Sequence, residues 1–129
     1  MRRVLLVLPS STYRAAAFLD AARRLGADVV TGSDTRQALA GVMGDHFVEL
    51  DLDDPEAAAS SIVRLAGRLP IDAVVAVDDV GSLTATIAAE RLGLPHNPLD
   101  AVAATRDKAA MRARLDTARV AQPAWRAVA

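Results

Sequence analysis

Short apolar runs in this chain alternate with longer stretches in which apolar residues recur at helical spacing. The first run, RVLLVLP from Arg3 to Pro9, is apolar almost throughout and is bounded by proline. This pattern is typical of a strand buried on both faces in a parallel sheet. Residues 12–26 then predict a helix that ends at Gly26. Its expected inward positions are Ala15, Phe18, Ala22 and Leu25.

The same alternation continues through residues 27–93. Segments 27–34, 46–52 and 71–79 predict further strands, the first of them ended by Gly32. Segments 35–44, 54–69 and 80–93 predict helices. The helix over 54–69 is the clearest, because Asp54 can cap it and Pro55 suits its first position. Its expected buried stripe is Ala58, Ile62, Leu65 and Leu69, and that of the helix over 80–93 is Leu83, Ile87 and Leu92.

Strands that alternate with helices predict an α/β fold. We expect a Rossmann-like open, mostly parallel sheet flanked by helices and ending in a helical linker. Two successive helices are predicted after residue 98, and Pro123 favours an extended segment from Arg119 onward. The pattern itself gives no sign of an internal repeat, a low-complexity linker or a second domain.

Composition limits the function classes. In these 129 residues, hydrophobic residues make up 52% and charged residues 24%, as in folded globular domains. The net charge is -1 and aromatic residues make up only 3%, so neither a basic surface nor base stacking favours nucleic-acid binding. There is no cysteine, which excludes disulfides and thiol chemistry. No apolar run approaches a membrane span or a signal sequence, so we expect a cytoplasmic protein with no membrane partner.

The first turn, PSSTYR, does not favour dinucleotide binding. It lacks the glycines that let a backbone approach a pyrophosphate. Ser10, Ser11 and Thr12 could contact an anion at the following helix or simply cap it. Asp34, after the second predicted strand, could contact a ribose or form a turn and a cap.

Acidic residues follow two further predicted strands. Asp78 and Asp79 stand at the carboxyl end of the fourth, where open α/β sheets bind ligands, although one of them could cap the next helix. The denser run from Glu49 to Glu56 could bind a hard cation, but a solvated strand edge and a helix cap explain it better. We predict no metal site. For His46 and His96 we expect structural or exposed positions.

The segment TRDKAAMR contains Lys108, the single lysine in the chain. Here we expect Thr105 to cap a helix, Asp107 to lie in its first turn, and Lys108 and Arg112 to share one face. Two cations on one face could bind a polyanion or could form an ordinary solvated surface.

The segment from Arg91 to Trp125, RLGLPHNPLDAVAATRDKAAMRARLDTARVAQPAW, resembles a junction found in ATP-grasp enzymes. That junction has an L-G-L-P run, a short helix, a helix that opens with D-K and contains an arginine, and a V-x-x-P exit. The strand–helix units before it resemble the N-terminal, pre-ATP-grasp domain of the same superfamily. The resemblance covers essentially the whole chain.

The resemblance implies a function. ATP-grasp enzymes are mostly ATP-dependent ligases that join a carboxylate to an amine or a thiol through an acylphosphate, with Mg²⁺ on the ATP phosphates. It implies nucleotide contacts for Lys108 and, more weakly, Arg112. It implies a cleft for a small-molecule carboxylate near Asp78, Asp79, Ser10 and Ser11. Residues 1–97 would be the pre-ATP-grasp α/β domain, and residues 98–129 would be a helical linker and the start of the ATP-grasp domain.

The resemblance also implies a limit. The remaining nucleotide and magnesium residues of the ATP-grasp fold would follow Trp125, so none of the residues here is expected to be catalytic. We expect this chain to be inactive and to bind neither ATP nor Mg²⁺ tightly without the remainder of the ligase. The alternatives are a stand-alone small-molecule-binding or regulatory domain, or a module that exposes an apolar face and forms a homodimer.

Overall fold

The structure is a computed structural model that describes residues 1–35 and 44–128. It divides into two compact units, Met1–His96 and Asn97–Ala129. The predicted helix over residues 35–44 lies mostly outside the described residues. Within the described residues, no helix is both long enough and apolar enough to cross a membrane.

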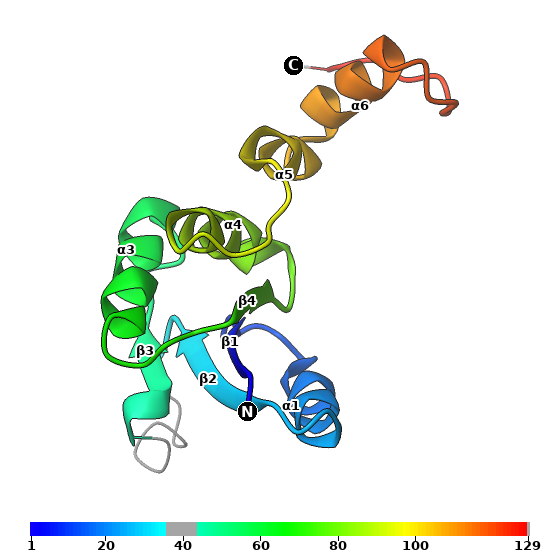
Figure 1. The fold of residues 1–129 in the computed structure, drawn as a ribbon. Helices are drawn as coiled ribbons and strands as arrows, with labels where there is room; N and C mark the ends of the chain where they lie inside the picture. Colours follow the sequence, from blue (N-terminus) through cyan, green and yellow to red (C-terminus); the bar gives the residue numbers. More distant parts are fainter. Residues whose placement is uncertain (36–43, 129) are drawn as a thin grey trace. The chain divides into compact units, whose positions relative to one another are not determined.

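The first unit is built on a parallel sheet (Figure 1). Among the described residues it has four strands in the order β3-β2-β1-β4. They are β1 (Arg3–Val7), β2 (Asp28–Ser33), β3 (Phe47–Glu49) and β4 (Ala73–Ala76). The predicted α/β fold with a parallel sheet is therefore confirmed.

Two predicted strand boundaries are wrong. Gly32 does not end β2, which continues to Ser33, because Gly32 pairs with Val7 and Val48 in the sheet. The third strand is only three residues long, and His46 belongs instead to the short 3₁₀ turn η1 (Gly44–His46). Proteins use glycine inside a strand where another group approaches closely. Here a Cβ on Gly32 would lie 2.6 Å from Leu50 Cδ1.

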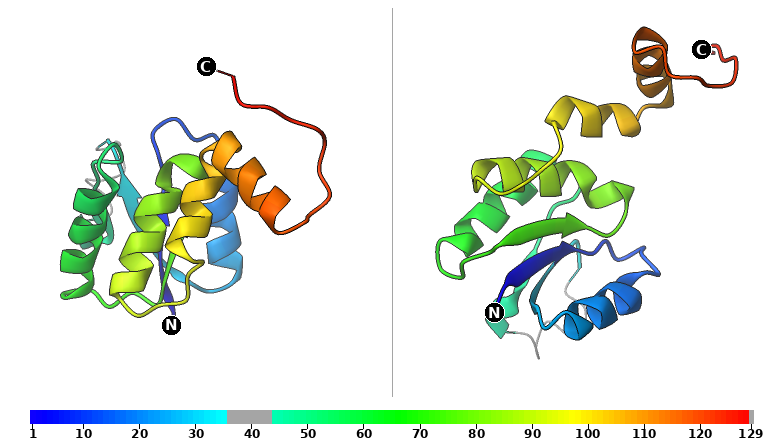
Figure 2. Two further views of the ribbon diagram at one scale, coloured as in Figure 1. Left: turned by 90° about the horizontal axis from the view of Figure 1, so that it is seen from above. Right: turned by 45° about the vertical axis from the view of Figure 1, so that its right-hand side comes forward.

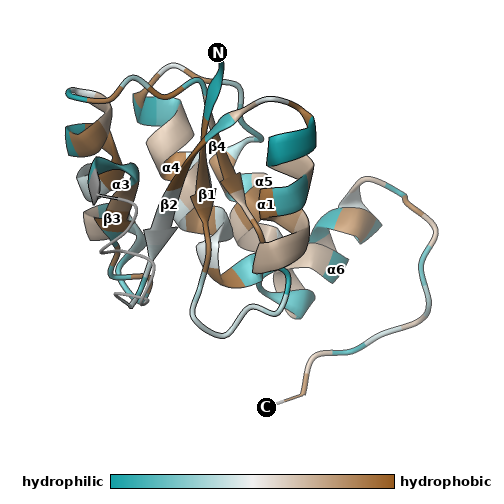
Figure 3. Ribbon diagram, turned by 90° about the horizontal axis from the view of Figure 1, so that it is seen from below, coloured by the Kyte–Doolittle hydropathy of each residue, from teal (hydrophilic) through white to brown (hydrophobic). Residues whose placement is uncertain are grey.

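Helices cover both faces of the sheet. Helix α1 (Ala15–Arg24) lies on one face, and α3 (Pro55–Ala66) and α4 (Ser82–Arg91) lie side by side on the other (Figure 2). Hydrophobic residues predominate in β1, at the centre of the sheet between these layers (Figure 3). The continuous apolar runs in the sequence predict this arrangement, because a strand that is covered on both faces needs apolar side chains on both, whereas a strand solvated on one face alternates apolar and polar residues.

Alternate residues of β1 point to opposite faces of the sheet, as they do in any strand. Leu6 and Leu8 pack with Phe18 and Leu19 of α1. Leu5 and Val7, on the other face, have no exposed surface. In α1, Ala22 is buried as predicted, whereas Leu25 is wrong as a core position because 83% of it is exposed. Leu25 follows the last turn of α1, where Gly26 takes φ +65° and turns the chain away.

Helix α3 begins as its sequence predicts. The Asp54 carboxylate accepts a hydrogen bond from the Ala57 amide at 3.1 Å, and Pro55 occupies the first position. Three of the four predicted stripe positions are buried. The fourth, Leu69, is half-buried because it lies beyond the end of the helix.

Helix α4 is buried over almost its whole middle, from Thr84 to Ala89. The predicted narrow stripe is wrong at two positions, since Leu83 and Leu92 are only half-buried. The reason is that α4 packs against both β4 and α3. Small alanine and threonine side chains let it approach both neighbours closely.

The second unit contains two helices in its described part, α5 (Leu99–Thr105) and α6 (Lys108–Thr117). Arg114 of α6 forms an ion pair with Asp100 of α5 at 2.8 Å. The segment after Arg119 forms no helix or strand in the described residues, as Pro123 predicts. Trp125 is tied back to α6, because its indole Nε1 donates a hydrogen bond to Asp116 at 2.8 Å.

Candidate functional site

The strand order places a topological switch point between β1 and β4. From β1 the chain moves outward through β2 to β3, and β4 then returns to the opposite side of β1. The loops that follow β1 and β4 consequently leave the sheet in different directions. In open parallel sheets, ligands bind in the crevice that forms at this point, beyond the carboxyl ends of the strands.

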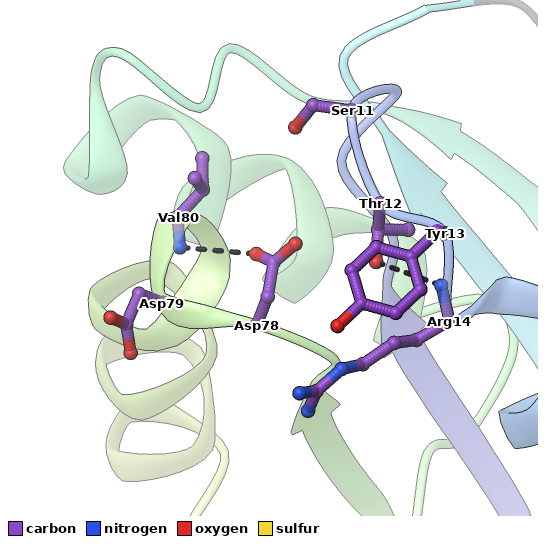
Figure 4. Close-up of a pocket in the computed structure, with 7 residues that line it drawn as sticks. All are labelled: Ser11, Thr12, Tyr13, Arg14, Asp78, Asp79 and Val80. Carbon is purple, nitrogen blue, oxygen red and sulfur yellow. Dashed lines mark hydrogen bonds between the residues drawn. The ribbon is translucent and has the colours of Figure 1, made fainter.

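A crevice is present at the switch point, with a volume of about 380 Å³ (Figure 4). One wall is the loop after β1, and the other is the 3₁₀ turn η2 (Asp79–Gly81) after β4. The volume lies within the range of small-molecule pockets. The lining residues are Ser11, Thr12, Tyr13, Arg14, Asp78, Asp79 and Val80.

The two aspartates differ in role. Asp78 caps η2, since its Oδ1 accepts a hydrogen bond from the Val80 amide at 3.1 Å. The prediction that one of the two aspartates caps the next helix is wrong for α4 (Ser82–Arg91), whose cap position is Gly81 and has no side-chain hydrogen bond; Asp78 caps the short turn before that helix instead. Asp78 is half-buried, and its carboxylate lies on the side of η2 that faces Tyr13 and Arg14 (Figure 4). Asp79 is exposed and projects from the other side of the turn.

The loop after β1 does not cap α1 through a side chain. The cap position is Arg14, which provides no side-chain hydrogen bond, and Thr12 Oγ1 accepts instead from the Arg14 amide at 3.3 Å. Capping as the alternative role for Ser10, Ser11 and Thr12 is therefore wrong at the helix itself. Ser11 and Thr12 line the crevice, whereas Ser10 does not.

Ser10 is bound to Asp34, which follows β2. The Ser10 amide donates to Asp34 Oδ1 at 2.7 Å, and the Ser10 hydroxyl donates to Oδ2 at 3.0 Å. Burial favours the protonated carboxyl, but these hydrogen bonds outweigh it and hold the pKa of Asp34 below its ordinary value. Asp34 therefore fixes the loop beside the crevice, a role that neither the ribose nor the helix-cap interpretation included.

Sequence reasoning missed Tyr13 and Arg14. Tyr13 is 87% exposed, and the Arg14 guanidinium carbon lies 5.6 Å from the centre of its ring. Tyr13 and, more weakly, the charge of Asp78 raise the pKa of Arg14, so its positive charge is secure. The available signal was their position directly after a buried strand, where the serines drew attention first.

A second pocket of about 430 Å³ lies along the ends of β2 and β3. Val80 lines both pockets, so the two adjoin at η2. The second pocket is acidic, with Asp34, Glu49, Leu50, Asp51, Leu52, Asp53 and Val80 in its walls. Across the described residues, however, no group of three or more acidic, histidine or cysteine side chains could hold a metal ion.

Histidine takes no part in the crevice. His46 lies at the opposite edge of the sheet, with Nε2 3.3 Å from Asp28 Oδ2, and His96 is exposed. Asp28 also accepts a hydrogen bond from Arg3 Nε at 2.6 Å. Arg3 first, and His46 to a lesser degree, outweigh burial and lower the pKa of Asp28. This cluster joins the starts of β1 and β2, and its role is structural.

The second unit holds the remaining candidates. Asp107, not Thr105, caps α6, because its carboxylate accepts from the Ala110 amide at 3.1 Å and Thr105 is the last residue of α5. Lys108 is the first residue of α6 and is exposed. Arg112 is half-buried and donates to Gln122 Oε1 at 3.2 Å, while Gln122 Nε2 donates to the Arg112 carbonyl at 2.9 Å.

Comparison with known proteins identifies the family. Residues 19–96 match the ATP-grasp N-terminal domain, which is more than half of the chain. The chain belongs to the ATP-grasp N-terminal domain family. A search of curated proteins found no match to the chain.

Two solved structures have a fold similar to that of most of the chain. An L-amino acid ligase from Bacillus licheniformis matches 91% of it with a TM-score of 0.75 at 22% identity. A phosphoribosylglycinamide synthetase from Anaerococcus prevotii matches 92% with a TM-score of 0.66 at 16% identity. The chain spans only 30% and 29% of these two proteins. The resemblance to ATP-grasp enzymes is thereby confirmed, for the N-terminal part of such an enzyme.

Proposed function

We propose that this chain is the N-terminal domain of an ATP-dependent ligase that joins a carboxylate to an amine or a thiol through an acylphosphate. The observation that carries the proposal is a charged crevice at the switch point of an ATP-grasp N-terminal fold. Of the two solved structures described above, one is named as a ligase and the other as a synthetase, which agrees with bond formation. The cytoplasm remains the expected location.

In this proposal the crevice is part of the substrate cleft. Ser11 and Asp78 contact the small-molecule substrate from the two walls of the crevice, and Asp79, whose carboxylate projects from the other side of η2, contributes at the rim. Ser10 contributes by holding the wall in place through Asp34. None of these residues acts as a catalyst.

Lys108, with Arg112 beside it, is the proposed nucleotide contact. Lys108 stands at the first position of α6, where the positive end of the helix dipole disfavours a cation by roughly 0.3–1 kcal/mol. Helix stability therefore does not explain this lysine. A phosphate would contact the exposed ammonium group of Lys108, whereas the Ala110 amide of the first turn is already bonded to the Asp107 carboxylate. The contribution of Arg112 should be smaller, because its guanidinium already bonds Gln122.

Magnesium fits this chain less well. In this proposal the carboxylates that hold the metal on the ATP phosphates belong to the remainder of the ligase. The same holds for catalysis, so residues 1–97 are proposed as the pre-ATP-grasp domain and residues 98–129 as a linker and the start of the ATP-grasp domain. This chain by itself should neither hydrolyse nor tightly bind ATP.

The test uses Lys108→Ala in the complete enzyme. We expect the KM for ATP to rise about tenfold, the effect of losing one charge-assisted contact. Lys108→Arg should restore most of the loss, and Arg24→Ala, at an exposed arginine of α1, should change nothing. An unchanged KM for ATP in Lys108→Ala would overturn the nucleotide role.

The alternative is a stand-alone domain that binds a small molecule, or a homodimer, with no ligase attached. The crevice itself would suit such a domain. The intact mass of the protein in its source cell separates the two, because a stand-alone domain would weigh 13.5 kDa. Size measurement over a dilution series would detect a homodimer.

A further inference from the structure

Opposite charges face each other across the switch-point crevice. Arg14 comes from the wall after β1, and Asp78 comes from the wall after β4. The two residues are 64 positions apart in sequence, so only the fold brings them to one pocket. Their juxtaposition is a property of the site and not of a local segment.

These two charges do not form an ion pair with each other, although both line the same small space. Each is held by its own neighbours instead. The Arg14 guanidinium lies beside the Tyr13 ring, and Asp78 Oδ1 accepts from the Val80 amide. Asp78 Oδ2 has no hydrogen-bond partner within residues 1–35 and 44–128. In the close-up, the hydroxyl end of Tyr13 points toward the space between the Arg14 guanidinium and the Asp78 carboxylate, and no interaction joins these two groups (Figure 4).

Tyr13 adds an aromatic surface to the same wall. A tyrosine that is 87% exposed gains little from packing within its own chain. Its ring lines the crevice next to Arg14, where it can cover the apolar part of a bound molecule. Ser11 and Thr12 complete this wall with small hydroxyl side chains.

We propose that the crevice binds a zwitterionic small molecule, with its carboxylate on Arg14, its ammonium group on Asp78 and its apolar part against Tyr13. A guanidinium can bind a carboxylate through two parallel hydrogen bonds, and Asp78 Oδ2 can accept from an ammonium group. A volume of about 380 Å³ admits a molecule of amino-acid size. The inference rests on the proposed function in one respect only, namely that the bound zwitterion is a substrate of the ligase.

The arrangement would also provide specificity. A molecule with a carboxylate and no ammonium group pairs with Arg14 but leaves the Asp78 carboxylate without a cationic partner. An amine without a carboxylate pairs with Asp78 but leaves the Arg14 guanidinium without an anionic partner. Rejection of singly charged analogues by such unpaired groups is a general source of discrimination.

The binding test uses the 129-residue chain and a panel of probes. The panel consists of the common L-amino acids, each with its matching deaminated acid and decarboxylated amine, titrated at millimolar concentration and followed by amide chemical shifts. We expect at least one amino acid to shift the amides of residues 11–14 and 78–80. Its two singly charged analogues should bind at least about tenfold more weakly.

Three variants assign the contacts. Asp78→Asn keeps an oxygen to cap η2 and removes only the charge, and Arg14→Gln keeps most of the stem and removes only the charge. Each of these two variants should weaken binding of the amino acid about tenfold or more. Asp78→Asn should leave binding of the deaminated acid little changed, and Arg14→Gln should leave binding of the decarboxylated amine little changed. Arg24→Gln, on the same helix but in its last turn, is the matched control and should bind normally.

The outcomes separate this inference from the proposed function. Absence of binding by every amino acid, or equal binding by the singly charged analogues, would overturn the inference. If the complete enzyme nevertheless forms ADP with a singly charged carboxylate, the proposed function stands and only the zwitterion site is ruled out. If an amino acid binds as expected and the complete enzyme forms no ADP, the zwitterion site stands and the proposed function fails.

Discussion

Gly81 lies directly against Val7, at the point where the walls of the crevice leave the sheet. A Cβ on Gly81 would be 2.6 Å from Val7 Cγ1 and 3.1 Å from Val7 Cβ. Val7 has no exposed surface and belongs to the sheet core, so it cannot move aside freely. The backbone of Gly81 has an ordinary φ of -89°, and the requirement for glycine is therefore one of space.

Gly81→Ala should destabilise the domain by about 1–3 kcal/mol, the usual cost of overpacking a core. Gly67→Ala is the matched control, because a Cβ there would meet only the Arg64 carbonyl oxygen at an ordinary 3.5 Å. Denaturant unfolding of the two variants measures the difference. If Val7→Ala is introduced first, Gly81→Ala should cost less, and equal costs in both backgrounds would show that the Val7 contact is not the cause.

The bond between Ser10 and Asp34 leads to a prediction on titration. Ser10→Ala removes the hydroxyl donor and retains the amide donor, so the pKa of Asp34 should rise toward its ordinary value without reaching it. A carboxyl NMR titration of both proteins measures this. An unchanged pKa would mean that the hydroxyl contributes nothing to holding the wall of the crevice.

A buried hydroxyl in α4 provides a test of stability. Thr84 is completely buried, and its Oγ1 finds no hydrogen-bond partner in the described part of the chain. Thr84→Val keeps the shape and removes the unsatisfied group, so it should stabilise the domain by about 1 kcal/mol. Thr86→Val should not, because Thr86 Oγ1 donates to the Ser82 carbonyl at 2.9 Å. Destabilisation by Thr84→Val would reveal a partner for the hydroxyl.

The Arg3–Asp28 pair should make stability depend on pH. The pKa of Asp28 is lowered in the folded protein, so its contribution is complete above the unfolded pKa of about 3.9 and is lost as the pH falls through the folded pKa. Asp28→Asn should therefore cost about 1–2 kcal/mol at pH 7 and progressively less in acid. Thermal unfolding as a function of pH measures this difference.

Asp20→Asn is the control for that experiment. Asp20 pairs with Arg23 at 2.8 Å, but both side chains are mostly exposed, and such pairs contribute little. Equal losses in Asp20→Asn and Asp28→Asn would contradict a special role for the partly buried pair.

The fold was predictable because its sequence signals are local and agree with one another. Continuous apolar strands, the Asp54–Pro55 helix start and the Gly26 stop all act over a few residues. The errors at Gly32, Leu83 and Leu92 arose where contacts between distant segments decide the outcome. Gly32 lies inside a strand because the Leu50 side chain approaches it closely, and α4 packs against both β4 and α3. Neither contact produces a periodic pattern of hydrophobic residues in the sequence.

The site was predictable only in part, for a related reason. Asp78 was found because an acid at the carboxyl end of a strand is visible in sequence. Arg14 and Tyr13 were not, because their proposed role depends on Asp78, which lies 64 residues later and lines the same crevice only in the folded chain. Likewise, the Ser10–Asp34 bond joins two strand ends that only the register of β1 and β2 brings together.

The measurement that tests the central claim most directly is ADP formation by the complete protein in the presence of ATP and Mg²⁺. Small carboxylates and amines should be supplied singly and in pairs. We predict ADP release that requires a carboxylate, gives an equivalent amount of ligated product when an amine or thiol is also present, and is absent with residues 1–129 alone. A complete protein that releases no ADP under any pairing, although it binds ATP, would contradict the assignment as part of a ligase.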